Sequence, residues 1–187
     1  MDYGQEQKFR SSLTRAVNPK SKIQNPKSTQ MESLTLETHS PEETKRLGSA
    51  LVDLLSPGAV VALRGELGSG KTCFVRGMAS HFATTEIVSS PTFTIVNQYG
   101  DDPRLYHVDL YRLGRLEELA DIGYEELFEP DGVCVIEWAE RAEDLLPARR
   151  VDILFEHVDE VTRRLTLRNL GLLPHSWSEQ LRGVLAE

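Results

Sequence analysis

The eight residues that decide the fold of this 187-residue chain spell GELGSGKT, running Gly65, Glu66, Leu67, Gly68, Ser69, Gly70, Lys71, Thr72. They match in full the pattern G-x-x-x-x-G-K-[S/T] of a phosphate-binding loop, or P-loop. A short apolar run at residues 59–63 precedes them, and residues 72–82 have helical periodicity, so the loop lies between a buried strand and a helix as the pattern requires. The sequence therefore predicts a nucleotide-binding protein that depends on Mg²⁺, with ATP hydrolysis as its expected activity.

Each residue type in the loop has a physical role. The glycines at 65, 68 and 70 permit backbone conformations and close approaches that a Cβ would block. The loop amides and the start of the helix then face the phosphates with partial positive charge. Lys71 reaches the β and γ phosphates, and the Thr72 hydroxyl ligates Mg²⁺. We expect nucleotide contacts from the whole stretch 65–73, which includes Cys73 after the motif.

Two acidic residues at the ends of apolar strands are candidates to complete the site. Asp109 follows the run 105–108, and Glu137 follows the run 133–136. Open α/β sheets bind ligands at the carboxyl ends of their strands, where a P-loop needs a carboxylate close to Mg²⁺. Either acid taken alone fits a helix cap or a surface position equally well, and the presence of the P-loop is what favours the site.

Several neighbours of these acids have two interpretations. His107 fits a general base, but strand alternation favours a structural hydrogen-bonding role at least as well. Tyr106, Tyr111 and Trp138 are able to stack on an adenine, although burial is the more frequent outcome for aromatic side chains. Arg112 fits either a phosphate contact or an ion pair with an acid.

Outward from the loop, strand-like runs alternate with helical segments. Leu34 and Leu36 alternate with polar residues, as in a short strand. Further strands are predicted at residues 93–96, 105–110, 133–136, 151–155 and 164–167, and short helices at 116–120 and 124–128. This order predicts an α/β fold: a single P-loop NTPase-like domain over residues 31–172, with a largely parallel sheet sandwiched by helices.

A capping box marks the helix that precedes the P-loop strand. Ser40 is placed to cap the amide of Glu43, and Pro41 suits the first helical position. The following apolar positions have helical spacing, and Pro57-Gly58 is expected to end the helix.

The two ends of the chain differ from this domain. Ser176 and Glu179 form a second capping box, which predicts a tail helix in residues 173–187 with an apolar stripe that includes Trp177. Residues 1–30 carry a net charge of +4, so the remainder carries −12. Because large apolar residues are scarce there, burial cannot offset the entropy of ordering, and we expect a disordered basic tail. A transit peptide and a translation start at Met31 are the alternative interpretations.

The overall composition disfavours several classes of protein. With a net charge of −8, the chain is not expected to bind nucleic acid by itself, so a partner would bind any RNA. No run approaches the roughly 18 apolar residues of a membrane span, and no apolar segment follows the early basic residues as in a secretory signal. Cys73 and Cys134 lack the spacing of metal ligands and are expected to be reduced thiols of a cytoplasmic protein.

Four segments give the chain a resemblance to a known family. They read GELGSGKTCFVRG at 65–77, SPTFTIVNQY at 90–99, YHVDLYRL at 106–113 and IEWAE at 136–140. In this order and at these spacings they resemble the bacterial tRNA threonylcarbamoyladenosine biosynthesis ATPases, the TsaE (YjeE) family. The SPTFT and HVDLYRL segments are far more discriminating than the P-loop, which many families share.

This resemblance implies a compact P-loop fold that binds ATP and Mg²⁺. It also implies a partner assembly of the proteins TsaB and TsaD, with which the chain would support transfer of a threonylcarbamoyl group to adenosine in tRNA. The tRNA would be reached through that assembly.

The resemblance also assigns roles to single residues. Thr72 and Glu137 would ligate Mg²⁺. Asp109 would be the acid near the γ-phosphate that hydrolysis needs, and with Lys71 it would form the catalytic pair. Segment 90–94 would sense the state of the nucleotide, and Arg163 would line the nucleotide site.

Departures from the family pattern leave the reactive groups in place. Ala139 stands where Pro is usual, which puts the geometry after Trp138 in question. Ser69 and Cys73 replace the commoner Ala and Thr, at positions whose side chains are not expected to touch phosphate.

Two other functions would use the same loop. A small-molecule kinase would phosphorylate an acceptor, typically beneath an Arg-bearing lid, and the Arg pairs at 149–150 and 163–164 lie in no obvious insertion. A nucleotide-gated binding module would dock to partners with negligible hydrolysis. A guanine-specific switch is disfavoured because no N-K-x-D segment follows the loop.

Overall fold

The computed structural model describes residues 32–82, 88–91, 94–101, 104–113 and 132–186. The chain divides into two units, Met1–Gln30 and Met31–Glu187, and the described residues all belong to the second. Three expectations therefore lie outside the described residues: the disordered tail at 1–30 and the short helices at 116–120 and 124–128.

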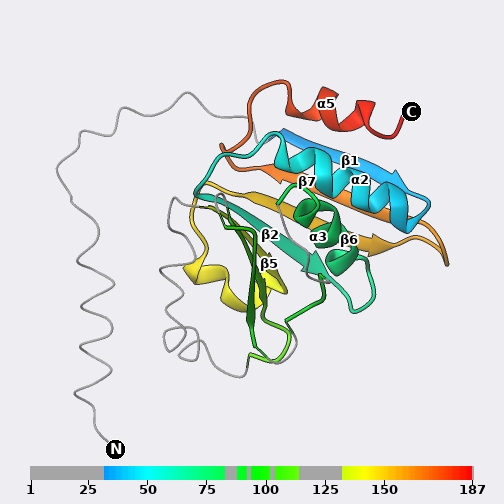
Figure 1. The fold of residues 1–187 in the computed structure, drawn as a ribbon. Coiled ribbons are helices and arrows are strands. Elements are labelled where there is room, and N and C mark those ends of the chain that lie inside the picture. Colours follow the sequence, from blue (N-terminus) through cyan, green and yellow to red (C-terminus); the bar gives the residue numbers. More distant parts are fainter. Residues whose placement is uncertain (1–31, 83–87, 92–93, 102–103, 114–131, 187) are drawn as a thin grey trace, which may run out of the picture. The chain divides into compact units, whose positions relative to one another are not determined.

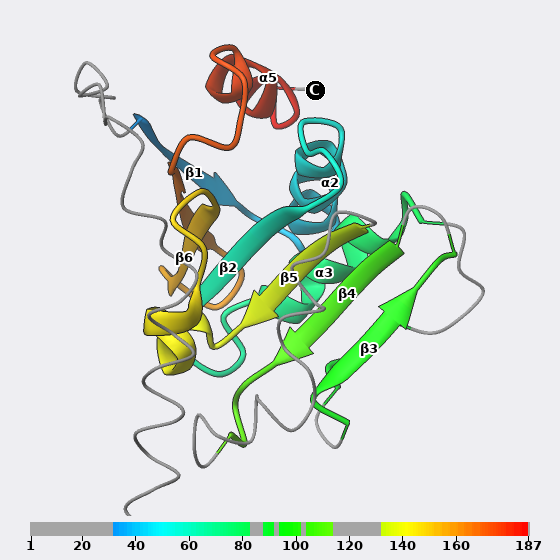
Figure 2. The ribbon, with the colours of Figure 1, turned by 90° about the vertical axis from the view of Figure 1, so that its left-hand side faces the viewer.

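The strands of the described residues form one seven-stranded sheet in the order β1-β7-β6-β2-β5-β4-β3 (Figures 1 and 2). Their bounds are β1 Glu32–Thr38, β2 Ala59–Gly65, β3 Val96–Tyr99, β4 Arg104–Asp109, β5 Gly132–Glu137, β6 Val151–His157 and β7 Arg163–Asn169. The four central strands β6, β2, β5 and β4 run parallel, whereas β1, β7 and β3 pair antiparallel with their neighbours. The predicted α/β class is confirmed, with a parallel centre and antiparallel margins.

Helices cover the sheet and complete its core. Helices α2 (Pro41–Val52) and α3 (Lys71–Ala79) lie together on one face (Figure 2). The 3-10 segment η2 (Ala139–Leu145) packs its buried alanines on the other face. Helix α5 (Trp177–Gly183) packs beside β1 and α2. None of the helices in this described part of the chain has the length and apolar character needed to cross a bilayer.

The contact between α2 and α3 fixes the helix that follows the P-loop. A Cβ placed on Gly48 would lie 2.2 Å from the Phe74 carbonyl oxygen, and one placed on Gly77 would lie 2.0 Å from the Lys45 carbonyl oxygen. Real Cβ atoms do not approach so closely, so the two helices touch backbone to backbone. The first turn of α3 is therefore held in one position at the end of β2.

The two predicted capping boxes had different outcomes. At α2 the Glu43 amide donates to Ser40 Oγ at 3.1 Å, and the Glu43 carboxylate accepts from the His39 amide at 2.7 Å, which confirms the first box. The helix itself ends at Val52, well before the predicted stop at Pro57-Gly58. At α5 the second box is wrong, because Ser176 is not extended and its hydroxyl accepts from the Gln180 side chain instead.

The predicted strand at 93–96 is also displaced in the structure. Residue 93 lies outside the described residues, and β3 begins at Val96, where the prediction ended. Ile95 has a φ of 64°, its amide donates to the Pro91 carbonyl, and its carbonyl accepts from the Asp109 amide at 2.9 Å. A left-handed residue cannot continue a strand, so this apolar position forms a turn at the edge of the sheet.

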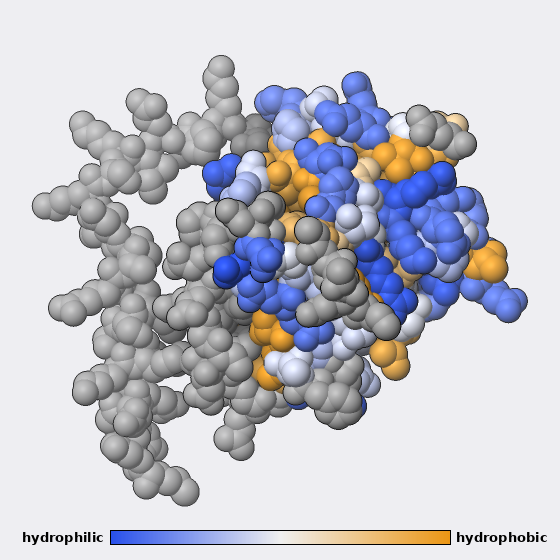
Figure 3. Space-filling view, in the orientation of Figure 1, coloured by the Kyte–Doolittle hydropathy of each residue, from blue (hydrophilic) through white to orange (hydrophobic). Residues whose placement is uncertain are grey.

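The described surface in Figure 3 is mainly hydrophilic, with apolar residues in separate patches. The large apolar side chains that are exposed are Leu67, Tyr111, Leu154, Val158 and Val161. Leu67 belongs to the P-loop and Tyr111 follows β4, so two of the five lie beside the region described next.

Candidate functional site

The P-loop joins the end of β2 to the start of α3 and takes the shape that its glycines permit. Gly65, Gly68 and Gly70 have φ angles of 128°, 76° and 107°, which other residues rarely adopt. A Cβ on Gly65 would also lie 2.3 Å from the Phe155 carbonyl oxygen. No side chain caps the start of α3, since Gly70 occupies the N-cap position. The first amides of α3 are thus left to bind an anion at this helix N-terminus.

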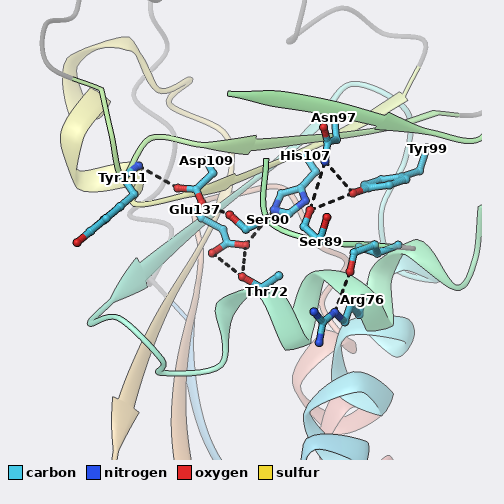
Figure 4. A network of polar contacts seen from close by, with 11 residues as sticks. Thr72, Arg76, Ser89, Ser90, Asn97, Tyr99, His107, Asp109, Tyr111 and Glu137 are labelled. Carbon is cyan, nitrogen blue, oxygen red and sulfur yellow. Dashed lines mark hydrogen bonds and ion pairs between the residues drawn. The ribbon is translucent and has the colours of Figure 1, made fainter. Parts of the chain in front are cut away.

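A cleft of about 330 Å³ opens over this helix start. The P-loop forms one wall, and the ends of β4 and β5 form the other (Figure 4). The lining residues are Leu67, Gly68, Ser69, Gly70, Lys71, Thr72, Cys73, Ser90, Asp109, Tyr111, Glu137 and Trp138. Most of the residues predicted for the site therefore meet in one cavity.

Thr72 and Glu137 are in direct contact inside the cleft. The Thr72 hydroxyl donates to Glu137 Oε1 at 2.8 Å and lies 3.1 Å from Oε2. Glu137 is the last residue of β5, and its side chain is only 4% exposed. A carboxylate and a hydroxyl held this closely offer hard oxygen ligands to a divalent cation.

Asp109 lies beside Glu137, because the two are register partners at the ends of β4 and β5. One Asp109 oxygen accepts from the Tyr111 amide at 2.9 Å, and the other accepts from the Ser90 hydroxyl. Asp109 as a residue is 9% exposed, and it lines the cleft. Both acids that the sequence selected are therefore at the site, and their separate roles remain predictions.

Lys71 is buried and folds back over its own loop. Its ammonium donates to the carbonyls of Gly65 at 2.7 Å and Glu66 at 2.9 Å, and it lies 4.0 Å from the centroid of the Trp138 ring. Burial lowers the pKa of Lys71, against the opposing attraction of Glu137, Glu140 and Asp109. Nearby anionic phosphate would favour the charged form of this amine.

Two aromatic residues flank the cleft. The rings of Tyr111 and Trp138 have centroids 4.9 Å apart, and Tyr111 is 42% exposed. Trp138 has a φ of 59°, and the 3-10 segment η2 starts immediately after it at the buried Ala139. Of the aromatic residues considered for stacking, these two line the cavity and Tyr106 does not. Tyr106 and Trp138 both pack against the core cluster that contains Val108 and Ile136.

Three residues predicted to contact the nucleotide do not line the cleft. Gly65 and Glu66 lie on the far side of the loop, beside a second hollow formed with β6. The stem of Arg163 passes Gly70, while its guanidinium donates to the carbonyls of the β6–β7 turn, residues 159–162. Arg163 is thus placed to hold this turn next to the P-loop, and its nucleotide contact remains a prediction.

The two replaced residues of the P-loop both line the cleft. Ser69 is fully buried, and its hydroxyl has no hydrogen-bond partner among the described residues. The Cys73 thiol approaches the Pro41 carbonyl at 3.4 Å, and burial raises its pKa.

Reasoning from the residues alone gave no role to the loop at residues 88–91, although the family resemblance pointed to Ser90. Arg76 of α3 donates to the Val88 carbonyl at 2.9 Å, and Tyr99 and Asn97 of β3 both donate to the Ser89 carbonyl (Figure 4). Local sequence could not predict these bonds, since each joins residues from separate elements. The loop is tied to the P-loop helix, to the sheet edge and to Asp109.

His107 contacts the site from behind. It is fully buried on β4, and its Nε2 lies 2.9 Å from Glu137 Oε1. It does not line the cleft, so this geometry favours the structural interpretation over a general base.

Comparison with known proteins gives consistent matches across this region. The profile of the family described as "Threonylcarbamoyl adenosine biosynthesis protein TsaE" matches residues 38–165. The chain is 40% identical over 142 residues to the tRNA threonylcarbamoyladenosine biosynthesis protein TsaE of Bacillus subtilis, which covers 75% of this chain and 89% of that protein. It is 42% identical over 130 residues to the protein of the same name from Treponema pallidum, covering 70% and 96%.

A solved structure agrees with these matches. The crystal structure of Bacillus subtilis YdiB is similar to this fold with a TM-score of 0.64 at 32% identity. The similarity covers 85% of this chain and 98% of that chain.

Proposed function

We propose, from the premise that this chain belongs to the threonylcarbamoyl adenosine biosynthesis protein TsaE family, that it is a Mg²⁺-dependent ATPase. The family acts in the biosynthesis of threonylcarbamoyladenosine in tRNA. The observation that carries the proposal is the convergence of Lys71, Thr72, Asp109 and Glu137 on one cleft beneath a P-loop.

The donor set in the cleft fits Mg²⁺ brought in by a nucleotide. Thr72 supplies a hydroxyl, Glu137 a carboxylate, and Asp109 a second carboxylate next to it. Among the described residues, no group of three or more His, Cys, Asp or Glu side chains is arranged to hold a metal ion. Mg²⁺ ordinarily binds to one or two protein ligands together with phosphate oxygens and water, so a sparse protein set suits it. When bound, the ion would neutralise charge on the phosphates.

The rest of the cleft would bind the phosphates of ATP. The first residues of α3 line the cleft, and an anion there would gain from the partial positive charge of the helix end. Lys71 would exchange its contacts with the carbonyls of Gly65 and Glu66 for the phosphates. Both carbonyls belong to the loop itself, so the ammonium lies within the loop that would bind the phosphates.

Asp109 would perform the hydrolytic step. Its carboxylate lies at the end of β4, across the cleft from Lys71 and beside Glu137. From there it would orient the attacking water and accept its proton, a role that is worth about 10²–10⁴-fold in rate when the group is well placed. Its bonds to the Ser90 hydroxyl and the Tyr111 amide fix the orientation of the carboxylate.

The proposed partners are the TsaD and TsaB proteins, with tRNA reached through that assembly. The net charge of −8 argues against direct binding to the phosphate backbone of RNA, because such binding needs clustered basic residues. An acidic ATPase that works on tRNA therefore needs a partner that holds the nucleic acid.

Phosphate release from the purified full-length chain tests the proposal. The measurement is made on the protein alone, with TsaB and TsaD, and with tRNA added, each in Mg²⁺ and in EDTA. We expect release that depends on Mg²⁺ and rises with the partners. A nucleotide-gated binding module would bind ATP with no release under any condition, and a kinase would consume ATP only when an acceptor is present.

A further inference from the structure

Glu137 is held from both sides by groups on different elements. Thr72 donates to its carboxylate from α3, and His107 lies 2.9 Å from Oε1 on β4 (Figure 4). Thr72 lines the cleft, whereas His107 does not. The carboxylate is therefore fixed by one contact on the cleft side and by another on the core side.

The histidine ring itself has little freedom to turn. It is completely buried on β4, where its register partners are Asn97 on β3 and Val135 on β5. The Tyr99 ring lies against it, with centroids 6.3 Å apart and a tilt of 34°. Figure 4 shows the imidazole between Tyr99 and Glu137. Neighbours on the two flanking strands, β3 and β5, thus set the direction in which Nε2 points.

The hydrogen-bond pattern identifies the tautomer. An ionised carboxylate only accepts hydrogen bonds, so Nε2 carries the proton and donates to Glu137. The other nitrogen, Nδ1, is buried and has no partner among the described residues. A proton on Nδ1 would be a buried donor without an acceptor, which is costly. The arrangement therefore favours the tautomer that carries its proton on Nε2.

Packing alone does not account for a histidine at this position. An apolar ring of similar size would fill the same space beside Tyr99 without leaving a buried nitrogen unpaired. The one polar interaction that His107 makes in the described structure is the bond to Glu137, and Glu137 is the proposed Mg²⁺ ligand.

We propose that His107 is a positioning residue that orients the Glu137 carboxylate for Mg²⁺, an inference that rests on the proposed function. His107 holds Oε1 from the core side, and its bond is to Oε1 alone, whereas Thr72 in the cleft lies within 3.1 Å of Oε2 as well as 2.8 Å from Oε1. Hydrogen-bonded partners of metal ligands commonly change metal affinity by about 10–100-fold when they are lost. His107 should therefore strengthen the protein's affinity for ATP in the presence of Mg²⁺, although it contacts neither the ion nor the nucleotide.

Two substitutions of His107 form a matched pair. In His107→Gln the side-chain amide can place an N–H near the position of Nε2, whereas in His107→Asn the shorter amide reaches only the position of Nδ1. Calorimetry gives the affinity of each full-length variant for ATP in Mg²⁺ and in EDTA. We expect His107→Asn to lose about 10–100-fold in the Mg²⁺-dependent part of the affinity, with unchanged binding in EDTA. His107→Gln should retain most of the Mg²⁺-dependent part.

A second background tests whether the effect passes through Glu137. In a Glu137→Ala protein, adding His107→Asn should cause no further loss of Mg²⁺-dependent affinity. Equal losses in the Gln and Asn variants, no loss in either, or equal losses with and without Mg²⁺ would each overturn the proposal.

Nitrogen NMR of the ¹⁵N-histidine-labelled wild-type protein tests the same bond without any substitution, ATP or metal. We expect a His107 ring with a protonated Nε2 and a bare Nδ1, and the reverse tautomer would overturn the proposal even if His107→Asn fails to fold. A wild-type protein whose ATP affinity is the same in Mg²⁺ and in EDTA would instead contradict the proposed function, while the NMR result would still report on the hydrogen bond.

Discussion

The central strands β2 and β5, called here the parallel part, and the margin formed by β1 and β7, called here the antiparallel part, differ in how they are buried. In the parallel part, β5 is buried at every residue and β2 at its first five, because core residues pack on both faces. In the antiparallel part, β1 alternates exposed and buried residues, and β7 has a similar alternation. There, the described core lies on one face only, with the apolar residues of α2 and α5.

The two parts also differ in role, because the residues of the candidate site lie at one end of the parallel strands and not on β1 or β7. The strands β2, β4 and β5 end at the same edge, so Gly65, Asp109 and Glu137 meet there. Strands β1 and β7 carry none of the residues that line the cleft. Substitutions in the antiparallel part should therefore change stability, and polar substitutions at the parallel edge should change function.

The largest expected effect is on stability in the antiparallel part. Leu167 of β7 is 2% exposed and lies between Leu34 on β1 and Ile153 on β6. Leu167→Ala should lower the free energy of unfolding by about 2–5 kcal/mol, since it removes buried contacts and leaves a cavity. Urea denaturation measures this change, and calorimetry on the folded variant should give a wild-type affinity for ATP.

Thr166 provides the control on the same strand. Its side chain is on the opposite face, where its hydroxyl pairs with Thr35 at the surface. Thr166→Ala should stay within about 0.5 kcal/mol of the wild type. If Leu167→Ala abolished ATP binding while the protein stayed folded, the assignment of stability to the antiparallel part and function to the parallel edge would be wrong.

The next effect is on function at the parallel edge. Lys71→Ala should reduce ATP hydrolysis by about 10²–10³-fold, as expected when one preorganised charge contact to a transition state is lost. Burial disfavours the charged amine in the protein without nucleotide, so its removal should leave the melting temperature unchanged or slightly higher.

Lys45→Ala is the matched control for charge. Lys45 lies on α2 with its ammonium 3.6 Å from Glu42, and it is not one of the residues that line the cleft. Hydrolysis by this variant should equal that of the wild type in a phosphate-release assay. Normal hydrolysis by a folded Lys71→Ala protein would contradict the site.

How far the sequence predicted this structure depends on the range of the interactions involved. The P-loop, the Ser40 cap and the strand ends at Asp109 and Glu137 are local patterns, and the structure places all of them as expected. The turn at Ile95 depends on a bond from Asp109, fourteen residues away in the sequence, so local apolar character pointed to a strand instead.

The arrangement of the antiparallel part shows the same limit. Strand β1 pairs with β7 rather than with its neighbour in sequence, and no short-range pattern specifies that pairing. Likewise, the alternation around His107 left both a general base and a structural role open, and it did not indicate the partner of the ring. The bond to Glu137 joins residues on different strands, which only the register of β4 and β5 brings together.

The third prediction tests whether Glu137 and Asp109 have different roles at the parallel edge. Glu137→Ala should weaken binding of ATP in Mg²⁺ by about 10–100-fold and leave binding in EDTA unchanged. Asp109→Asn should bind ATP in Mg²⁺ nearly normally but hydrolyse it about 10²-fold more slowly, because a group that acts only in the transition state lowers turnover without changing ground-state affinity. Calorimetry and phosphate release on both variants separate these roles, and the opposite pattern would mean that the two assignments are reversed.

The smallest expected effect lies in the turn between β6 and β7. The exposed Asp159 carboxylate accepts from the amides of Val161 at 3.0 Å and Thr162 at 2.7 Å. The hydrogen bonds from Thr162 lower the pKa of Asp159 below its ordinary value of 3.8, and the bond from the Val161 amide adds a smaller effect in the same direction. A carboxylate with a lowered pKa stabilises the folded protein above its unfolded pKa, and this contribution is lost as the pH falls through the folded value. Asp159→Ala should thus lower the melting temperature slightly at pH 5–7.

The pH dependence distinguishes these hydrogen bonds from a general effect of charge. Asp144, an exposed acid in η2, gives a matched control, because Asp144→Ala removes the same charge at another place. The difference in melting temperature between wild type and Asp159→Ala should stay constant from pH 7 to pH 5 and shrink below pH 3.8, where protonation of Asp159 weakens the turn in the wild type. ATP affinity should not change in either variant. If Asp159→Ala weakened ATP binding, the turn that Arg163 holds beside Gly70 would belong to the functional edge, and the antiparallel part would no longer be support alone.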